Sequence, residues 1–113
     1  MKNKIKTIYN PIPLELFENY LNTLVNRVFK ILPLKEEKSL TVDTYIMNLL
    51  SELTGNYQLI NQIHNDSLYE TLLANLQSLI GMQDNYRHIV LNTISVVEQI
   101  KTKYCKKEWS CNG

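Results

Sequence analysis

Glycine, proline and cysteine are scarce in this sequence. Of its 113 residues, three are glycine, three are proline and two are cysteine. These low contents exclude collagen-like chains and low-complexity linkers. Gly55, Gly81 and Gly113 stand far apart, so the sequence has no glycine-rich loop of the kind that binds phosphate groups.

The sequence also lacks an excess of charge of either sign. Its 12 basic and 11 acidic residues give a net charge of +1. This balance excludes a dedicated, strongly basic nucleic-acid binder and an acidic disordered segment. No apolar run approaches the roughly 20 residues that span a bilayer. The first six residues interleave lysines and form no apolar signal-peptide core, so we expect a cytoplasmic protein without a membrane partner.

Residues suited to catalysis or metal binding are equally sparse. The two histidines, His64 and His88, belong to no His-Glu-x-x-His motif. Cys105 and Cys111 have no two further ligands beside them, so their spacing favours thiols over a zinc site or a disulfide. We therefore predict no catalytic residues, no metal site and no cofactor, and we expect that the protein is not an enzyme.

Bulky apolar residues are abundant, with 17 leucines, 11 isoleucines and 6 valines. Their spacing alternates between three and four residues, which is typical of amphipathic helices. The clearest series follows Pro13, a residue that suits the first position of a helix, and comprises Leu14, Phe17, Leu21, Leu24, Val28 and Ile31. It predicts a helix over residues 13–32 that ends before Pro33, because proline disfavours a helical conformation of the preceding residue. The charged segment 35–38 is expected to be a solvated connector.

The same periodicity predicts three more helices. Their ranges are 41–54, 67–80 and 85–104. Gly55 is expected to end the first of these and Gly81 the second. Ser67 and Glu70 have the spacing of a capping box at the start of a helix. The segment 57–64 fits either a short helix or an extended piece.

Four helices joined by short connections predict an all-α fold, a small antiparallel bundle of about four helices. We expect one domain over residues 1–113, with residues 1–12 as an extended N-terminal arm and residues 105–113 as a flexible basic tail. The residues central on their apolar faces should be buried, and these are Leu21, Leu24, Val28, Leu49, Leu72, Leu76, Val90 and Val97.

The first predicted helix has a wider apolar surface than packing within one bundle requires. Eleven of the twenty residues from 13 to 32 are apolar. Leu16, Tyr20 and Phe29 lie beside the central seam, and exposed apolar patches mark interaction sites. We predict that these three residues bind a protein partner, either a second copy of the chain or a larger protein. The alternative is that the N-terminal stretch or the segment 57–64 covers this flank.

The same helix carries a row of amides, formed by Asn19, Asn22 and Asn26. Such a row is either ordinary solvent-facing surface or an uncharged interface that pairs with another subunit through hydrogen bonds. The sequence leaves both interpretations open.

Basic residues gather at both ends of the chain, whereas residues 7–100 hold 5 basic and 10 acidic residues. One interpretation is that the ends contact phosphate groups and that an aromatic side chain stacks on bases. The other is that the charges only keep the protein soluble. The candidate nucleic-acid-binding residues are Lys2, Lys4, Lys6, Lys101, Lys103, Lys106, Lys107 and Trp109.

These observations predict a non-enzymatic helical module for protein–protein interaction. The many lysines, asparagines and tyrosines indicate an A/T-rich coding sequence, as in many bacterial and phage mobile elements. We therefore expect a small accessory or regulatory subunit of a bacterial or phage multi-component system, such as phage defence or its inhibition. The alternative is a nucleic-acid-associated accessory protein that uses its basic ends.

Overall fold

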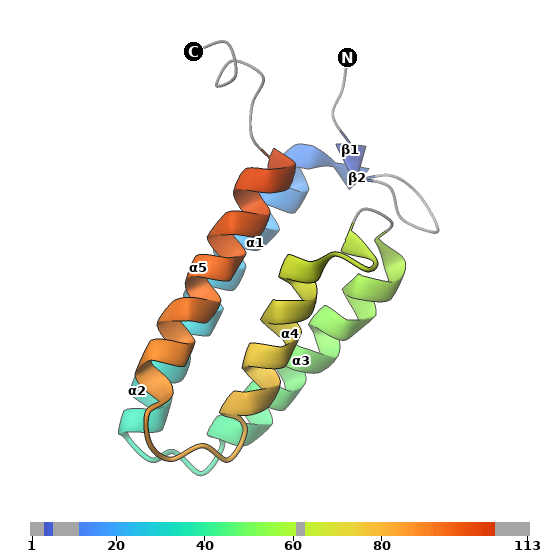
Figure 1. The fold of residues 1–113 in the computed structure, drawn as a ribbon. Helices are drawn as coiled ribbons and strands as arrows, with labels where there is room; N and C mark the ends of the chain where they lie inside the picture. Colours follow the sequence, from blue (N-terminus) through green and yellow to red (C-terminus); the bar gives the residue numbers. More distant parts are fainter. Residues whose placement is uncertain (1–3, 6–11, 61–62, 106–113) are drawn as a thin grey trace.

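Four long helices lie side by side in the computed structural model, which describes residues 4–5, 12–60 and 63–105 (Figure 1). They are α1 (Leu14–Phe29), α3 (Val42–Leu59), α4 (Ser67–Leu79) and α5 (Tyr86–Cys105). A shorter helix, α2 (Ile31–Glu36), follows α1. Two short strands, β1 (Lys4–Ile5) and β2 (Ile12–Pro13), precede α1 and pair with each other antiparallel. The structure confirms the prediction of a small all-α antiparallel bundle.

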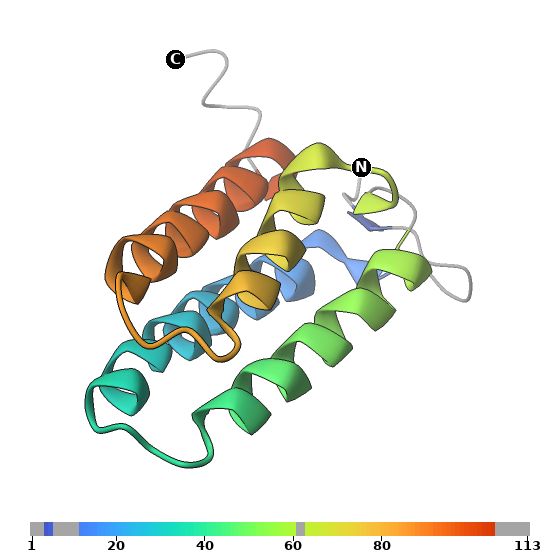
Figure 2. The same ribbon diagram turned by 60° about the horizontal axis from the view of Figure 1, so that its bottom comes forward.

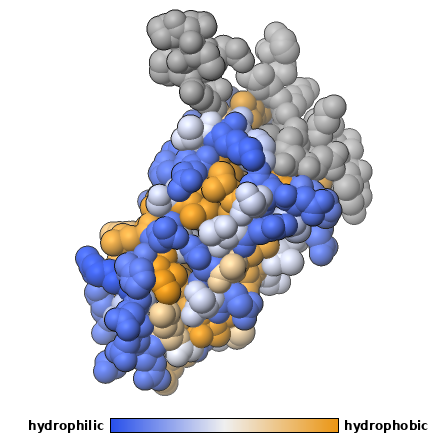
Figure 3. Space-filling view, viewed as in Figure 1, coloured by the Kyte–Doolittle hydropathy of each residue, from blue (hydrophilic) through white to orange (hydrophobic). Residues whose placement is uncertain are grey.

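The long helices pack in the order α3, α4, α5 and α1. α1 and α3 therefore occupy the outer positions, and their backbones approach each other much less closely than those of the other neighbours (Figure 2). On the face where α5 and α4 lie in front, hydrophobic residues follow the line between the two helices and are interrupted by hydrophilic ones (Figure 3). Because the backbones of α1 and α3 lie apart, these two helices contact each other largely through side chains.

The predicted helix over 13–32 is wrong at its C-terminal end. α1 ends at Phe29, and α2 starts at Ile31 and continues through Pro33. Pro33 lies in the first turn of α2, where backbone N–H groups have no partner within the helix. Proline cannot donate to the carbonyl four residues earlier, and its ring crowds that carbonyl, which belongs to Phe29. The helix therefore breaks before the proline and resumes around it.

The segment 35–38 is only partly the solvated connector that its charges predict. Lys35 belongs to α2 and is buried, whereas the rest of the segment is exposed. The Nζ of Lys35 donates hydrogen bonds to the carbonyl oxygens of Leu79 and Met82, both at 2.6 Å. Leu79 is the last residue of α4 and Met82 lies in the connection after it, so the lysine joins α2 to the C-terminal end of α4 and to that connection.

α3 continues through Gly55, so the predicted stop at this glycine is wrong. Tyr57, in the last turn of α3, stacks on Tyr69 of α4 with 5.8 Å between the ring centroids. The hydroxyl of Tyr57 also donates to the carboxylate of Glu70 at 2.5 Å. These contacts with α4 outweigh the low helix propensity of glycine, which costs about 1 kcal/mol relative to alanine.

The segment 57–64, for which the sequence leaves a short helix and an extended piece open, adopts neither as a whole. Residues 57–59 complete α3, and residues 63–65 form a turn that leads into α4. Residues 61–62 lie outside the described residues, as do residues 1–3, 6–11 and 106–113. Most of the predicted N-terminal arm and C-terminal tail therefore falls outside them as well.

The N-cap of α4 is Asp66, one residue before the predicted one. Its carboxylate accepts hydrogen bonds from the N–H groups of Leu68 and Tyr69, at 2.8 and 3.2 Å. Ser67 is the first helical residue, so the predicted capping box of Ser67 and Glu70 is wrong. Aspartate and serine are comparably good N-caps, which is why the sequence alone did not distinguish these neighbours.

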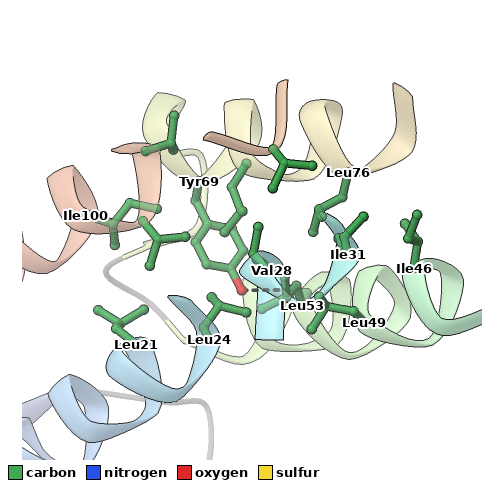
Figure 4. Packing of buried hydrophobic residues seen from close by; sticks show 14 of the residues in the cluster. Leu21, Leu24, Val28, Ile31, Ile46, Leu49, Leu53, Tyr69, Leu76 and Ile100 are labelled. Atoms are coloured by element: carbon green, nitrogen blue, oxygen red, sulfur yellow. Dashed lines mark hydrogen bonds between the residues drawn. The ribbon is translucent and has the colours of Figure 1, made fainter. Parts of the chain in front are cut away.

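The core lies where the four long helices meet, and the eight predicted core residues are all buried. Tyr69 enters this core from α4, and its hydroxyl donates to the carbonyl oxygen of Leu53 at 3.0 Å (Figure 4). Labelled side chains from all four long helices and from α2 point into the same core. The prediction of which faces are buried is therefore confirmed.

Gly55 and Gly81 are the two glycines at which the sequence predicts a helix end, and substituting each by alanine tests whether the helix ends there. A Cβ at Gly55 would meet no neighbouring atom, whereas Gly81, just after α4, has a φ of +77°. Gly55→Ala is expected to raise the free energy of unfolding by about 0.5–1 kcal/mol, because alanine loses less backbone entropy in a helix. Gly81→Ala is expected to lower it by about 1–2 kcal/mol, the cost of a left-handed conformation. Urea denaturation measures both, and effects of the same sign would contradict the assignment.

Candidate partner-binding surface on α1

α1 turns one long face away from the core. Leu16 and Phe29, near the two ends of this face, have 56% and 53% of their surface exposed. The other exposed residues between them are uncharged, and together the six are Leu16, Asn19, Asn22, Thr23, Asn26 and Phe29. We call these six residues the outer face of α1. Charged residues are depleted at the centres of protein interfaces, so an uncharged exposed row suits contact with another protein.

The structure does not bring the three predicted partner-binding residues together. Leu16 lies one turn before Tyr20, whose hydroxyl reaches α3, so both lie on the α3 flank of α1. Phe29 lies two turns beyond Asn22, whose side chain accepts a hydrogen bond from Lys101 of α5 at 2.7 Å. Phe29 is therefore on the opposite flank, towards α5.

Tyr20 is half-buried and belongs to a polar network between α1 and α3. Its hydroxyl donates to the carboxylate of Glu52. The same hydroxyl accepts a hydrogen bond of 2.9 Å from the side-chain amide of Asn56. Arg27, two turns further along α1, binds both carboxylate oxygens of Glu52 at 2.9 Å. The hydroxyl of Tyr45 donates to the carbonyl oxygen of Arg27 at 2.8 Å. These five residues, which we call the α1–α3 network, engage Tyr20 within the protein.

The α1–α3 network shifts the pKa values of its members. Hydrogen bonds from Arg27 and then from Tyr20 lower the pKa of Glu52 to about 2. Burial, followed by the hydrogen bond to Glu52, raises the pKa of Tyr20 above its ordinary value. Both shifts favour an ionised carboxylate beside a neutral phenol at neutral pH, which is the state that holds the two helices together.

The Glu52 carboxylate is expected to make the stability of the fold depend on acid pH. Its pKa in the folded protein lies below the ordinary value of 4.5, so its contribution is present above that pH and is lost as the pH falls through about 2. The loss should be about 1 kcal/mol, because the ion pair is partly exposed to solvent. Thermal unfolding as a function of pH measures it in the wild type and in Glu52→Gln.

The difference between these two proteins isolates Glu52, because other carboxylates titrate in both. The wild type should be the more stable protein near neutral pH, and the two stability curves should approach each other as the pH falls towards 2. Curves that stay parallel over the whole acid range would contradict the assigned role of Glu52.

The described lysines among the candidate nucleic-acid-binding residues are engaged within the protein. The Nζ of Lys101 lies 2.7 Å from Oδ1 of Asn22 and 3.2 Å from a carboxylate oxygen of Glu98. The Nζ of Lys103 donates to Oδ2 of Asp66 at 2.6 Å. For Lys4, only the backbone is described. The remaining candidates lie outside the described residues, and these are Lys2, Lys6, Lys106, Lys107 and Trp109. Nucleic-acid binding by the chain ends stays a prediction.

Asp66 joins the start of α4 to the end of α5. Besides capping α4, its carboxylate accepts hydrogen bonds from Lys103 and from the hydroxyl of Tyr104. Burial alone would raise the pKa of Asp66, but these hydrogen bonds and those of the cap outweigh burial, so the net shift is downward. Cys105, the first residue of the predicted flexible tail, is instead the last residue of α5 and is buried.

A cavity of about 430 Å³ lies at the end of the bundle where α2 leads into α3 and α4 leads into α5. Its charged lining is mixed, with Lys35 and Lys38 alongside Glu36, Asp43 and Asp84. The amine of Lys35, already bound to two carbonyls, lies 4.0 Å from the carboxylate of Asp43. The bonds of Lys35 to the carbonyls of Leu79 and Met82 hold the two connections against each other.

Other exposed large apolar residues are scattered over the described structure. Leu40 lies in the connection before α3, Met47 on α3 and Leu91 on α5. Single exposed apolar residues of this kind are common on soluble proteins. The outer face of α1 differs because its two apolar residues are joined by an uncharged row.

Within residues 4–5, 12–60 and 63–105, no three His, Cys, Asp or Glu side chains are grouped so that they could hold a metal ion. None of the described helices is both long enough and apolar enough to cross a membrane. No family model, curated protein or solved structure matches this chain.

Proposed function

We propose that this protein is a non-enzymatic helical module for protein–protein interaction, a small accessory subunit that binds its partner through the outer face of α1. The observation that carries the proposal is an exposed row of uncharged residues bounded by Leu16 and Phe29. Protein interfaces are enriched in aromatic residues and depleted in lysine, glutamate and aspartate at their centres. The row has this composition, in a chain of which 20% is charged.

The packing of α1 supports the same role because it makes the helix a rigid platform. The core lies behind α1, the α1–α3 network holds one flank, and the contact between Lys101 and Asn22 holds the other. A preorganised surface loses little conformational entropy when a partner binds. The proposed setting, a bacterial or phage multi-component system, rests on the amino-acid composition.

A photoactivatable phenylalanine analogue placed at Asn26 tests this proposal in cells that naturally produce the protein. Asn26 lies in the outer face and is exposed, so irradiation should produce a covalent adduct with the partner. The same analogue at Ser51, on the exposed side of α3, is the matched control and should produce none. Mass spectrometry identifies the captured chain. A missing adduct at Asn26, or equal adducts at both positions, would overturn the proposal.

A further inference from the structure

The outer face of α1 is complementary to itself when a second copy runs in the opposite direction. Its midpoint lies between Asn22 and Thr23. Three pairs of exposed residues lie at equal distances before and after this midpoint and are chemically complementary: Glu15 with Lys30, Leu16 with Phe29, and Asn19 with Asn26. We propose that a second copy of this chain docks antiparallel on the outer face of α1, around a two-fold axis at this midpoint. This inference rests on the proposed function and names its partner.

Charge determines the direction of the second copy. A two-fold axis makes each contact occur twice, because residue i of one copy meets residue j of the other and the reverse. Antiparallel helices that cross at the midpoint place Glu15 of each copy level with Lys30 of the other, since rise along a helix is uniform. A parallel arrangement would instead place like charges beside each other at both ends. The distribution of charge along α1 therefore favours the antiparallel dimer.

The amides at the centre are suited to the same symmetry. An asparagine side chain both donates and accepts hydrogen bonds, so Asn19 of one copy can pair with Asn26 of the other. No described residue forms a hydrogen bond with either of these two side chains. Their backbone carbonyls are used, that of Asn19 by the hydroxyl of Thr23 and that of Asn26 by the N–H of Lys30. Both amides are therefore available to a second copy.

The two ends of the face supply apolar contact. Leu16 of one copy is level with Phe29 of the other, and because they lie on opposite flanks they border the amide centre from both sides. Arg27 mirrors Glu18 in the same way, but both oxygens of Glu52 already bind its guanidinium. The ionic pairing between copies therefore depends on Glu15 and Lys30.

Charge reversal followed by exchange of partners tests the dimer. Glu15→Lys alone or Lys30→Glu alone places like charges at both ends and should raise the dissociation constant roughly ten- to a hundred-fold. An equimolar mixture of the two variants restores both opposite-charge pairs, so heterodimers should form with near wild-type affinity. Lys38→Glu, an exposed charge away from α1, is the matched control and should leave association unchanged.

Analytical ultracentrifugation over a wide range of concentration measures these associations. The inference is overturned by a wild-type protein that remains a 13.2 kDa monomer throughout, by a dimer that neither reversal weakens, or by a mixture that does not recover. A persistent monomer together with capture of a different protein at Asn26 overturns the second copy and leaves the proposed function standing. A persistent monomer without any adduct at Asn26 overturns both. Recovery in the mixture supports the dimer, because helix destabilisation by a reversed charge would not be repaired by a second destabilised chain.

Discussion

Leu76→Ala and Leu24→Ala are each expected to lower the free energy of unfolding by about 2–5 kcal/mol. Both side chains are fully buried, Leu24 on α1 and Leu76 on α4 (Figure 4). Truncation removes the transfer free energy of three carbon atoms and leaves a cavity that a closely packed interior fills only in part. Since a small domain is stable by only about 5–15 kcal/mol, either change should remove a large share of its stability.

Urea denaturation of the two variants measures this loss. Leu40→Ala is the matched control, because Leu40 is 99% exposed and its truncation removes no packing. It should change the free energy of unfolding by less than about 0.5 kcal/mol. Losses that small at both Leu24 and Leu76 would mean that these helix faces do not form the core.

The helices and their buried faces were predictable because both follow from local periodicity. An amphipathic helix buries the same stripe whichever neighbour covers it, so the spacing of leucines and valines identified the core without any knowledge of the packing order. The eight residues predicted as central on their faces are all buried. The number of helices followed from the same pattern, except for α2, of which the prediction placed only Ile31 and Leu32 in the first helix.

The helix ends were less predictable because distant residues decide them. The local sequence predicts that the helix ends at Gly55. α3 nevertheless continues, because Tyr57 contacts residues of α4. Asp66 and Ser67 are adjacent residues with similar capping strength. Lys103, 37 residues further along the chain, binds the Asp66 carboxylate that caps α4. A sequence pattern contains no record of such contacts.

The candidate surface was predictable only in part for the same reason. The width of the apolar stripe indicated that some large residues of the first helix would be exposed, and Leu16 and Phe29 are. Tyr20 differs because its partner Glu52 lies 32 residues away on α3. Which flank of α1 meets α3 depends on the order of the helices in the bundle. The spacing of Tyr20 and Arg27, two turns apart on one flank, was the one local signal of a shared acidic partner.

Lys35→Met is expected to lower the free energy of unfolding by about 1–3 kcal/mol, although the position of Lys35 in a charged segment gives no sign of this loss. The Lys35 ammonium donates to the carbonyl oxygens of Leu79 and Met82, and α4 has no basic residue in its own last turn. The lysine therefore supplies from α2 the cation that stabilises the C-terminal end of α4. Burial lowers the pKa of Lys35, and the nearby charge of Asp43 opposes this shift.

Methionine retains the apolar stem of Lys35 but removes a donor from both carbonyl oxygens. That of Leu79 still accepts from the N–H of Met82 at 3.2 Å, whereas that of Met82 loses its bond to the lysine, and a buried unsatisfied group costs about 1–3 kcal/mol. Urea denaturation measures the total, and Lys38→Met is the control, because Lys38 is exposed and carries the same charge. Hydrogen exchange at Gly81 provides a local measurement, since its N–H donates to Asp43 at 3.0 Å in the connection that Lys35 holds. Exchange there should accelerate in Lys35→Met and not in Lys38→Met. Equal stability of the two variants would mean that water satisfies the end of α4 as well as the lysine does.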